Sequence, residues 1–132
     1  MSRLRILVVD DDPANREVAE VILRAAGHTV TLVGDGSDAV RLCIEEGQLF
    51  DLVVMDIAMP VMDGEEATRR LKSHPRTRHI PVLCCSAKAS HANQDDGVEA
   101  GCDHYLTKPF RRAQLLEAVE ETLARAGKRS NA

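Results

Sequence analysis

The stretch at residues 51–60 reads Asp51-Leu52-Val53-Val54-Met55-Asp56-Ile57-Ala58-Met59-Pro60, and it decides the fold of this chain. Its apolar residues 52–55 run without a polar break, as is typical of a strand buried on both faces of a parallel sheet. Asp56 follows directly, and Pro60 and Gly64 indicate that a loop begins there. Ligands of open α/β sheets bind at the carboxyl ends of the strands, and an unpaired buried carboxylate is costly. We therefore predict that Asp56 belongs to a functional site.

The rest of the chain repeats the same unit, an apolar strand followed by a helix. Strands are expected at residues 4–9, 30–33, 52–55, 80–85 and 103–107. Helical spacing of apolar residues follows each strand, from Pro13 to Ala25, at 39–44, from Asp63 through Leu71, at 88–100 and from Phe110 to Leu123. This alternation predicts an α/β fold, in which a parallel sheet carries helices on both faces. The length of 132 residues suits one domain, expected at 1–126, followed by a polar C-terminal tail at 127–132.

Two of the expected helices carry more specific predictions. The first is expected to bury one face, formed by Val18, Val21, Ile22 and Ala25. The third has the spacing of a capping box, with Asp63 before the helix and Glu66 in its first turn.

Composition and charge exclude several classes of function. The net charge of −4 argues against a nucleic-acid-binding surface. The apolar runs are no longer than a strand, so no membrane-spanning segment is expected. The N-terminal residues 1–5 lead straight into a strand without the pattern of a signal peptide, and we expect a cytoplasmic protein.

The cysteines and the basic residues receive structural interpretations. The four cysteines are Cys43, Cys84, Cys85 and Cys102, and none of them forms a C-x-x-C pair. We expect small buried hydrophobes with free thiols in a reducing cytoplasm, without a zinc site or disulfides. The basic residues within 69–78 are expected to form a solvated face near the end of a helix.

Polar side chains gather where the predicted strands end. The first strand ends in Asp10-Asp11-Asp12, the third in Asp56, the fourth in Ser86 and the fifth in Lys108. Two carboxylates about 4 Å apart repel by roughly 4 kcal/mol at an effective dielectric constant of 20, so a cation is needed among them. Mg²⁺ suits such oxygen ligands. A carboxylate beside Mg²⁺, with a lysine and a hydroxyl in reach, can accept a phosphoryl group.

Four motifs in this order resemble a known family. They are Ile6-Leu7-Val8-Val9-Asp10-Asp11-Asp12-Pro13, Val54-Met55-Asp56-Ile57-Ala58-Met59-Pro60-Val61-Met62-Asp63-Gly64, Cys85-Ser86-Ala87 and Lys108-Pro109-Phe110. From Leu4 to Leu123, the chain resembles the receiver domain of two-component response regulators. The resemblance implies a flavodoxin-like, doubly wound sheet of five parallel strands in the order 2-1-3-4-5.

The resemblance also implies a role for individual residues. Asp56 would accept the phosphoryl group from a sensor histidine kinase or a histidine phosphotransfer protein. Mg²⁺ or Mn²⁺ would be bound by Asp56 and Asp11, by the backbone carbonyl of Ala58 and, through water, by Asp10. Lys108 would contact the phosphoryl group, and the Lys108–Pro109 peptide bond would be cis. Ser86 and Tyr105 would act as the switch, in which Ser86 moves toward the phosphoryl group and Tyr105 turns inward.

The resemblance implies a signalling switch whose only chemistry is its own phosphotransfer and autodephosphorylation, rather than a metabolic enzyme. Phosphorylation would change a protein-interaction surface formed by residues 88–100, the last strand and the last helix. No output domain is visible after Leu123, so we expect a single-domain regulator that acts on a downstream protein target. The kinase is expected to dock along the first helix, near residues 14–18.

Simpler interpretations remain for some of these residues. Asp12 could serve solely as the N-cap of a helix, and Tyr105 could serve solely to pack against the core. The motif Asp10-x-Asp12 after a strand also fits a small phosphohydrolase of the haloacid dehalogenase type, although that leaves Asp56 without a purpose. A third possibility is an interaction module that works without phosphorylation.

Overall fold

The structure is a computed structural model that describes residues 3–57, 64–86 and 101–130. Its strands are β1 (Arg5–Val9), β2 (Thr29–Val33), β3 (Leu52–Asp56), β4 (Val82–Ser86) and β5 (His104–Thr107). Its helices are α1 (Pro13–Ala25), α2 (Gly36–Val40) with the π-helical turn η1 (Arg41–Glu45), α3 (Gly64–Ser73) and α5 (Arg112–Ser130). The strands form one parallel sheet in the order β2-β1-β3-β4-β5, so the predicted fold and strand order are confirmed.

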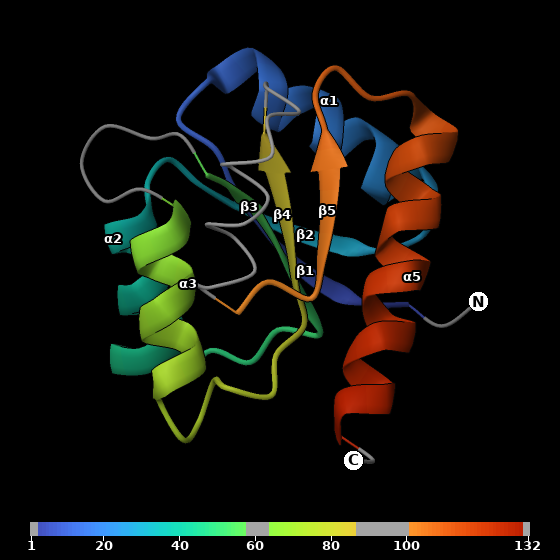
Figure 1. Cartoon of the computed structure of the whole chain (residues 1–132). Helices are drawn as coiled ribbons and strands as arrows, with labels where there is room; N and C mark the ends of the chain where they lie inside the picture. Colours follow the sequence, from blue (N-terminus) through green and yellow to red (C-terminus); the bar gives the residue numbers. More distant parts are fainter. Residues whose placement is uncertain (1–2, 58–63, 87–100, 131–132) are drawn as a thin grey trace.

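The sheet separates two hydrophobic cores. Figure 1 shows α2 and α3 on one face of the sheet and α1 and α5 on the other. Successive strand residues point to opposite faces, so Leu7 and Val9 pack toward α3, whereas Ile6 and Val8 pack toward α1 and α5. Because both faces are covered, the central strands β3 and β4 are buried along their whole length and β1 is buried beyond Arg5, as the sequence predicted. The edge strands β2 and β5 are only partly buried and carry polar residues such as Thr31 and His104.

Local signals at the start of α1 agree with the sequence. The Asp12 side chain accepts a hydrogen bond from the backbone N–H of Ala14 at 2.9 Å, and Pro13 follows at the first helical position. The predicted N-cap is therefore confirmed. Asp63 and the segment 88–100, which also carried helix predictions, lie outside the described residues.

The buried face of α1 differs from the prediction. The helix buries Ala19 and Leu23, whereas Val18 is 49% exposed and Val21 is 60% exposed. Two apolar stripes run along this helix. The predicted stripe contains Val18 and Val21, the other stripe, displaced by one residue, contains Ala19 and Leu23, and Ile22 belongs to both. Packing against the sheet and α5 selects between them, and no local property of the helix does.

The expectation that every cysteine is free is wrong. Cys84 in β4 and Cys102, shortly before β5, form a disulfide with a Cα–Cα distance of 6.1 Å. These residues are 18 positions apart in the chain, and the parallel pairing of β4 with β5 brings them together. Cys43 and Cys85 are buried free thiols, as predicted, and burial raises their pKa values to about 11 and about 12.

Lys72 and the end of α5 also depart from the predictions. The Lys72 side chain is only 13% exposed, because its Nζ lies 3.0 Å from Asp103 Oδ2 and donates to the carbonyl of Ile80. It is therefore not part of a solvated face. The chain is helical through Ser130, so most of the tail predicted from residue 127 is a continuation of α5. Among the residues that the structure describes, none of the helices combines the length and the apolar character that a membrane-spanning helix needs.

Candidate functional site

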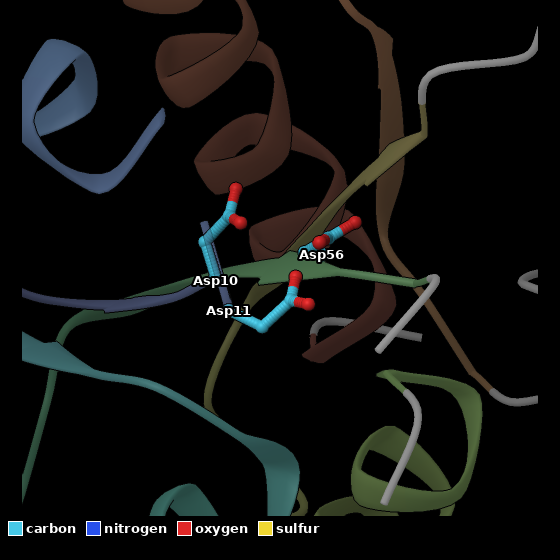
Figure 2. Close-up of side chains that lie close together, drawn as sticks. All are labelled: Asp10, Asp11 and Asp56. Atoms are coloured by element: carbon cyan, nitrogen blue, oxygen red, sulfur yellow. The ribbon is translucent and has the colours of Figure 1, made fainter. Parts of the chain in front are cut away.

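The predicted polar residues meet at the carboxyl edge of the sheet. Asp10 follows β1, Asp56 ends β3, Ser86 ends β4 and Lys108 follows β5. Oxygen atoms of Asp10, Asp11 and Asp56 all lie within 4.8 Å of one another, and Figure 2 shows the three carboxylates beside the end of β3. The predicted convergence of these carboxylates is therefore confirmed.

The three carboxylates differ in their access to solvent. Asp10 is 5% exposed and Asp56 is 7% exposed, whereas Asp11 is open to solvent. Their oxygens are the ligands that Mg²⁺ prefers, and an exposed member leaves room for the water molecules that Mg²⁺ usually keeps. The donor set thus fits a hard divalent cation held by Asp10, Asp11 and Asp56. Ala58, which was predicted to add a backbone carbonyl, lies outside the described residues.

Lys108 brings a positive charge to the carboxylates. Its Nζ lies 2.5 Å from Asp10 Oδ2 and 3.6 Å from Asp56 Oδ1. Burial lowers the pKa of Lys108, but the hydrogen bond with Asp10 and the negative charges of Asp56 and Asp10 outweigh it, so its pKa is raised overall. The amine therefore stays protonated at neutral pH and offsets part of the repulsion between the carboxylates.

Backbone hydrogen bonds hold these side chains in place. The N–H of Lys108 donates to the carbonyl of Ser86 at 2.7 Å, which joins the ends of β5 and β4. The N–H of Asp12 donates to Asp10 Oδ1 at 2.9 Å, and Arg16 donates to the Asp10 carbonyl. The Lys108–Pro109 bond is cis, as predicted.

Gly64 is a site residue that the sequence identified only as a sign that a loop begins after the third strand. Its N–H donates to the carbonyl of Ile57 at 2.8 Å, which sets the start of α3 directly against the end of β3. A Cβ atom at this position would overlap the backbone carbonyl of Asp56. Only glycine allows this approach, so the backbone that carries Asp56 depends on it.

A cavity of about 440 Å³ opens beside the carboxylates, between the sheet and α1. Val8, Val54 and Phe110 supply apolar walls, and Asp56 and Lys108 lie at its polar part. α1 contributes further lining residues, among them Asn15 and the exposed Val18. The site is therefore accessible from the side of α1.

The two predicted switch residues lie in different surroundings. Ser86 is buried, with 6% of its surface exposed, one position beyond the pair formed by Asp56 and Cys85 in the sheet register. Tyr105 is partly buried in β5 and packs against the core on the α3 side. Tyr105 is the register partner of Cys84, which lies two residues before Ser86 in β4. It therefore does not stand at the strand end where the carboxylates meet.

Comparison with known proteins agrees with this geometry. A family model described as "Response regulator receiver domain" matches residues 6–120. The chain belongs to this family. The receiver domain is 40% identical over 122 residues to a gliding motility regulatory protein of Myxococcus xanthus, covering 92% of the chain and 15% of that relative. It is 36% identical over 121 residues to the DNA-binding dual master transcriptional regulator RpaA of Synechocystis, covering 92% of the chain and 49% of that relative. The receiver domain thus spans less than half the length of either protein.

Solved structures of receiver domains share the fold of this chain. The receiver domain of the sensor histidine kinase PA1611 from Pseudomonas aeruginosa has a TM-score of 0.85 and 37% identity, and the match covers 93% of this chain and 99% of that one. Its structure holds a magnesium ion in the active-site cleft. The chemotaxis protein CheY4 of Vibrio cholerae has a TM-score of 0.86 and 27% identity, with 92% and 100% of the two chains covered.

Proposed function

We propose that this receiver domain accepts a phosphoryl group on Asp56, in the cytoplasm, from a sensor histidine kinase or a histidine phosphotransfer protein. The observation that carries the proposal is the placement of Asp56, buried between two further carboxylates and the ammonium of Lys108. Three acids and one lysine around one strand end are costly unless a divalent cation joins them, and a cation held there can attract the oxygens of a phosphoryl group. One relative, a probable histidine kinase 4 of Oryza sativa, is 35% identical and covers 89% of this chain.

The transfer requires one bond to form and one to break. An Oδ atom of Asp56 attacks the phosphorus of the donor's phosphohistidine, and the phosphorus–nitrogen bond breaks with its electron pair left on the imidazole. A bound divalent cation, Mg²⁺ or Mn²⁺, supplies positive charge for the phosphoryl oxygens. Asp10, Asp11 and Asp56 would hold that cation, and Lys108 Nζ, 3.6 Å from Asp56 Oδ1, offers a second positive charge.

The acyl phosphate carries roughly −1.5 to −2 charge units, whereas the free Asp56 carboxylate carries −1, so negative charge increases and moves outward at this strand end. Ser86 would donate a hydroxyl hydrogen bond toward that charge, and Lys108 would pair with it as a point charge. We propose that the resulting shift of Ser86 is accompanied by a change in the packing of Tyr105. This change would alter the surface of β5 and α5, which a downstream protein target would read. Residues 88–100, which were also expected to contribute, lie outside the described residues.

The donor protein is proposed to approach from α1. Val18 and Val21 expose apolar surface on this helix, and Val18 also lines the cavity that leads to Asp56. An imidazole ring entering from this side would meet the apolar walls of that cavity.

Labelling with a small phosphodonor such as acetyl phosphate, in the presence of Mg²⁺, tests the proposal. The intact mass of the purified protein should increase by one phosphoryl group, and Asp56→Asn should abolish the increase. Asp51→Asn is the matched control, since Asp51 lies just before the other end of β3, where its side chain accepts the N–H of Arg5. That variant should be labelled like the wild type.

Other results would support the alternatives. Loss of label in Asp10→Asn, with label retained in Asp56→Asn, would favour the phosphohydrolase of the haloacid dehalogenase type. A wild-type protein that takes no label, with Mg²⁺ present, would favour an interaction module that works without phosphorylation.

A further inference from the structure

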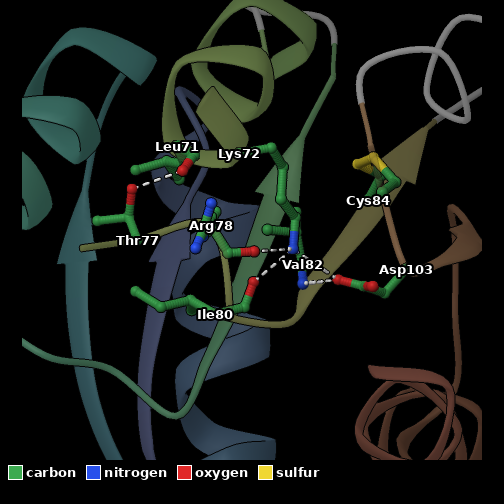
Figure 3. A network of polar contacts seen from close by, with 9 residues as sticks. Leu71, Lys72, Thr77, Arg78, Ile80, Val82, Cys84 and Asp103 are labelled. Carbon is green, nitrogen blue, oxygen red and sulfur yellow. Dashed lines mark hydrogen bonds and ion pairs between the residues drawn. A yellow bond between two sulfur atoms is a disulfide. The ribbon is translucent and has the colours of Figure 1, made fainter. Parts of the chain in front are cut away.

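The disulfide between Cys84 and Cys102 lies next to the elements of the proposed switch. Cys84 is fully buried in β4, and Cys102 is partly exposed just before β5. Figure 3 shows the two sulfur atoms joined beside a network of polar contacts that includes Lys72 and Asp103. Disulfides in a reducing cytoplasm are usually transient, catalytic or redox-sensing rather than structural.

The polar network holds the two cysteines close together independently of the bond between them. Asp103, the neighbour of Cys102, donates its N–H to the Val82 carbonyl at 2.9 Å and accepts from the Val82 N–H at 2.8 Å. Its Oδ2 also pairs with Lys72 Nζ at 3.0 Å. These contacts do not involve sulfur, so they remain after reduction. The two thiols then stay adjacent, and the bond can form again without a search through many conformations.

The same pair of cysteines is connected to the switch residues through β4 and β5. Cys84 is the register partner of Tyr105, and both pack into the core on the α3 side. Ser86 lies two positions after Cys84, within the covalent loop that the disulfide closes. A bond between Cys84 and Cys102 therefore restrains β4, which carries Ser86, and the start of β5, which carries Tyr105.

We propose that Cys84 and Cys102 form a reversible dithiol–disulfide modification site, oxidised by small disulfides of the glutathione type, and that the oxidised form restrains the Tyr105 switch. The modification site stands on the geometry of the cysteines alone, and its effect on the switch rests on the proposed function.

The exchange proceeds in two steps. The thiolate of Cys102, which is the more exposed of the pair, attacks one sulfur of the small disulfide and releases one small thiolate. The thiolate of Cys84 then attacks Cys102 Sγ in the mixed disulfide and releases the second small thiolate. Two electrons pass from the protein to the small disulfide, and the two protons of the protein thiols pass to the released thiolates. A small dithiol or excess thiol reverses both steps.

Cys85 provides an internal comparison. It is adjacent to Cys84 in the chain, but it is a free thiol that packs into the core on the opposite face of the sheet. A variant at this position should leave the redox response intact. Substitution of the partly exposed Cys102 should remove the response and leave the stability close to that of the reduced wild type.

The modification site is tested by thiol counting in glutathione buffers. The full chain is equilibrated at several ratios of reduced to oxidised glutathione, quenched, unfolded and alkylated, and its mass is measured. We expect two alkylated cysteines under oxidising buffers and four under reducing buffers, and the melting temperature should fall on reduction. Cys85→Ala should lose one alkylated cysteine in each state and keep the change in melting temperature, whereas Cys102→Ser should show no change. Four alkylated cysteines at every ratio, or two at every ratio, would overturn the proposal.

The effect on the switch is tested through tyrosine fluorescence. The chain has one Tyr and no Trp, so its intrinsic emission reports on Tyr105. Acetyl phosphate with Mg²⁺ should change this emission more in the reduced protein than in the oxidised protein. Cys102→Ser should match the reduced protein in both buffers. Equal changes in both redox states of a fully labelled wild type would overturn the restraint. If neither state takes label at Asp56, the proposed function and the restraint fail together, and the thiol count still decides the modification site.

Discussion

Replacing Lys108 by methionine should destabilise the metal-free domain and make its stability depend strongly on Mg²⁺. Lys108 Nζ lies 2.5 Å from Asp10 Oδ2 and 3.6 Å from Asp56 Oδ1, and these carboxyl side chains are only 7% and 9% exposed. The attraction across the 3.6 Å contact alone is about 5 kcal/mol at an effective dielectric constant of 20. Breaking a buried pair by removing one partner typically costs about 3–5 kcal/mol, because a charge is left uncompensated. We expect a loss in that range.

Urea unfolding, followed by far-UV circular dichroism in EDTA and in Mg²⁺, measures this effect. A ligand at 100 times its dissociation constant stabilises a folded protein by about 2.7 kcal/mol. The variant has one positive charge fewer among its carboxylates, so it should bind Mg²⁺ more tightly and gain more stability from Mg²⁺ than the wild type. An unfolding free energy in EDTA within about 0.5 kcal/mol of the wild type would refute the reasoning.

Lys72→Met is the matched control for that experiment. Lys72 is also mostly buried and also pairs with a carboxylate, that of Asp103 at 3.0 Å, but it lies away from the acidic cluster. This variant should lose stability in EDTA and should gain no more from Mg²⁺ than the wild type does. An equal rescue of both variants by Mg²⁺ would show that the metal does not act through the three carboxylates.

Three further predictions concern the metal site, a close backbone contact and a buried thiol. Asp11→Ala should stabilise the metal-free domain, because it removes a like charge near Asp56, and should abolish Mg²⁺ binding in calorimetry; a lower melting temperature in EDTA would contradict this. Gly64→Ala should cost about 1–3 kcal/mol in urea unfolding, because its Cβ overlaps the Asp56 carbonyl, whereas Gly127→Ala, with open space in α5, should be neutral or stabilising. Burial raises the pKa of Cys85 to about 12, so the unfolded thiol, with an ordinary value of 9.0, ionises first. The unfolding free energy should therefore fall between these pH values, and Cys85→Ala should make that decline shallower.

The convergence of the site residues could be predicted because it depends on strand order and strand ends. Each polar residue follows an apolar strand, and parallel strands bring their carboxyl ends to one edge. The sequence therefore placed Asp10, Asp56 and Lys108 together before any distance was known. It could not supply the 2.5 Å contact between Lys108 and Asp10, because side-chain geometry depends on the packing around both residues.

The predictions about α1 and Lys72 were wrong because both depend on contacts between distant parts of the chain. The α1 helix offers two apolar stripes, and the choice of Ala19 and Leu23 over Val18 and Val21 depends on what packs against the helix. The burial of Lys72 depends on a carboxylate, Asp103, that is 31 residues away in the chain. Such pairings are set by long-range contacts, which periodicity and propensity do not report.

The sequence by itself determined the α/β class, the succession of five strands and the edge of the sheet at which the acids and the lysine collect. It did so because buried parallel strands must be apolar along their length and because polar residues mark where each strand stops. Only the tertiary structure decided which face of α1 is buried, that Gly64 must touch the backbone of Asp56, and that Cys84 and Cys102 are bonded. These features depend on contacts between separate elements of the fold, and those contacts are set by how the helices and strands pack rather than by any local sequence pattern.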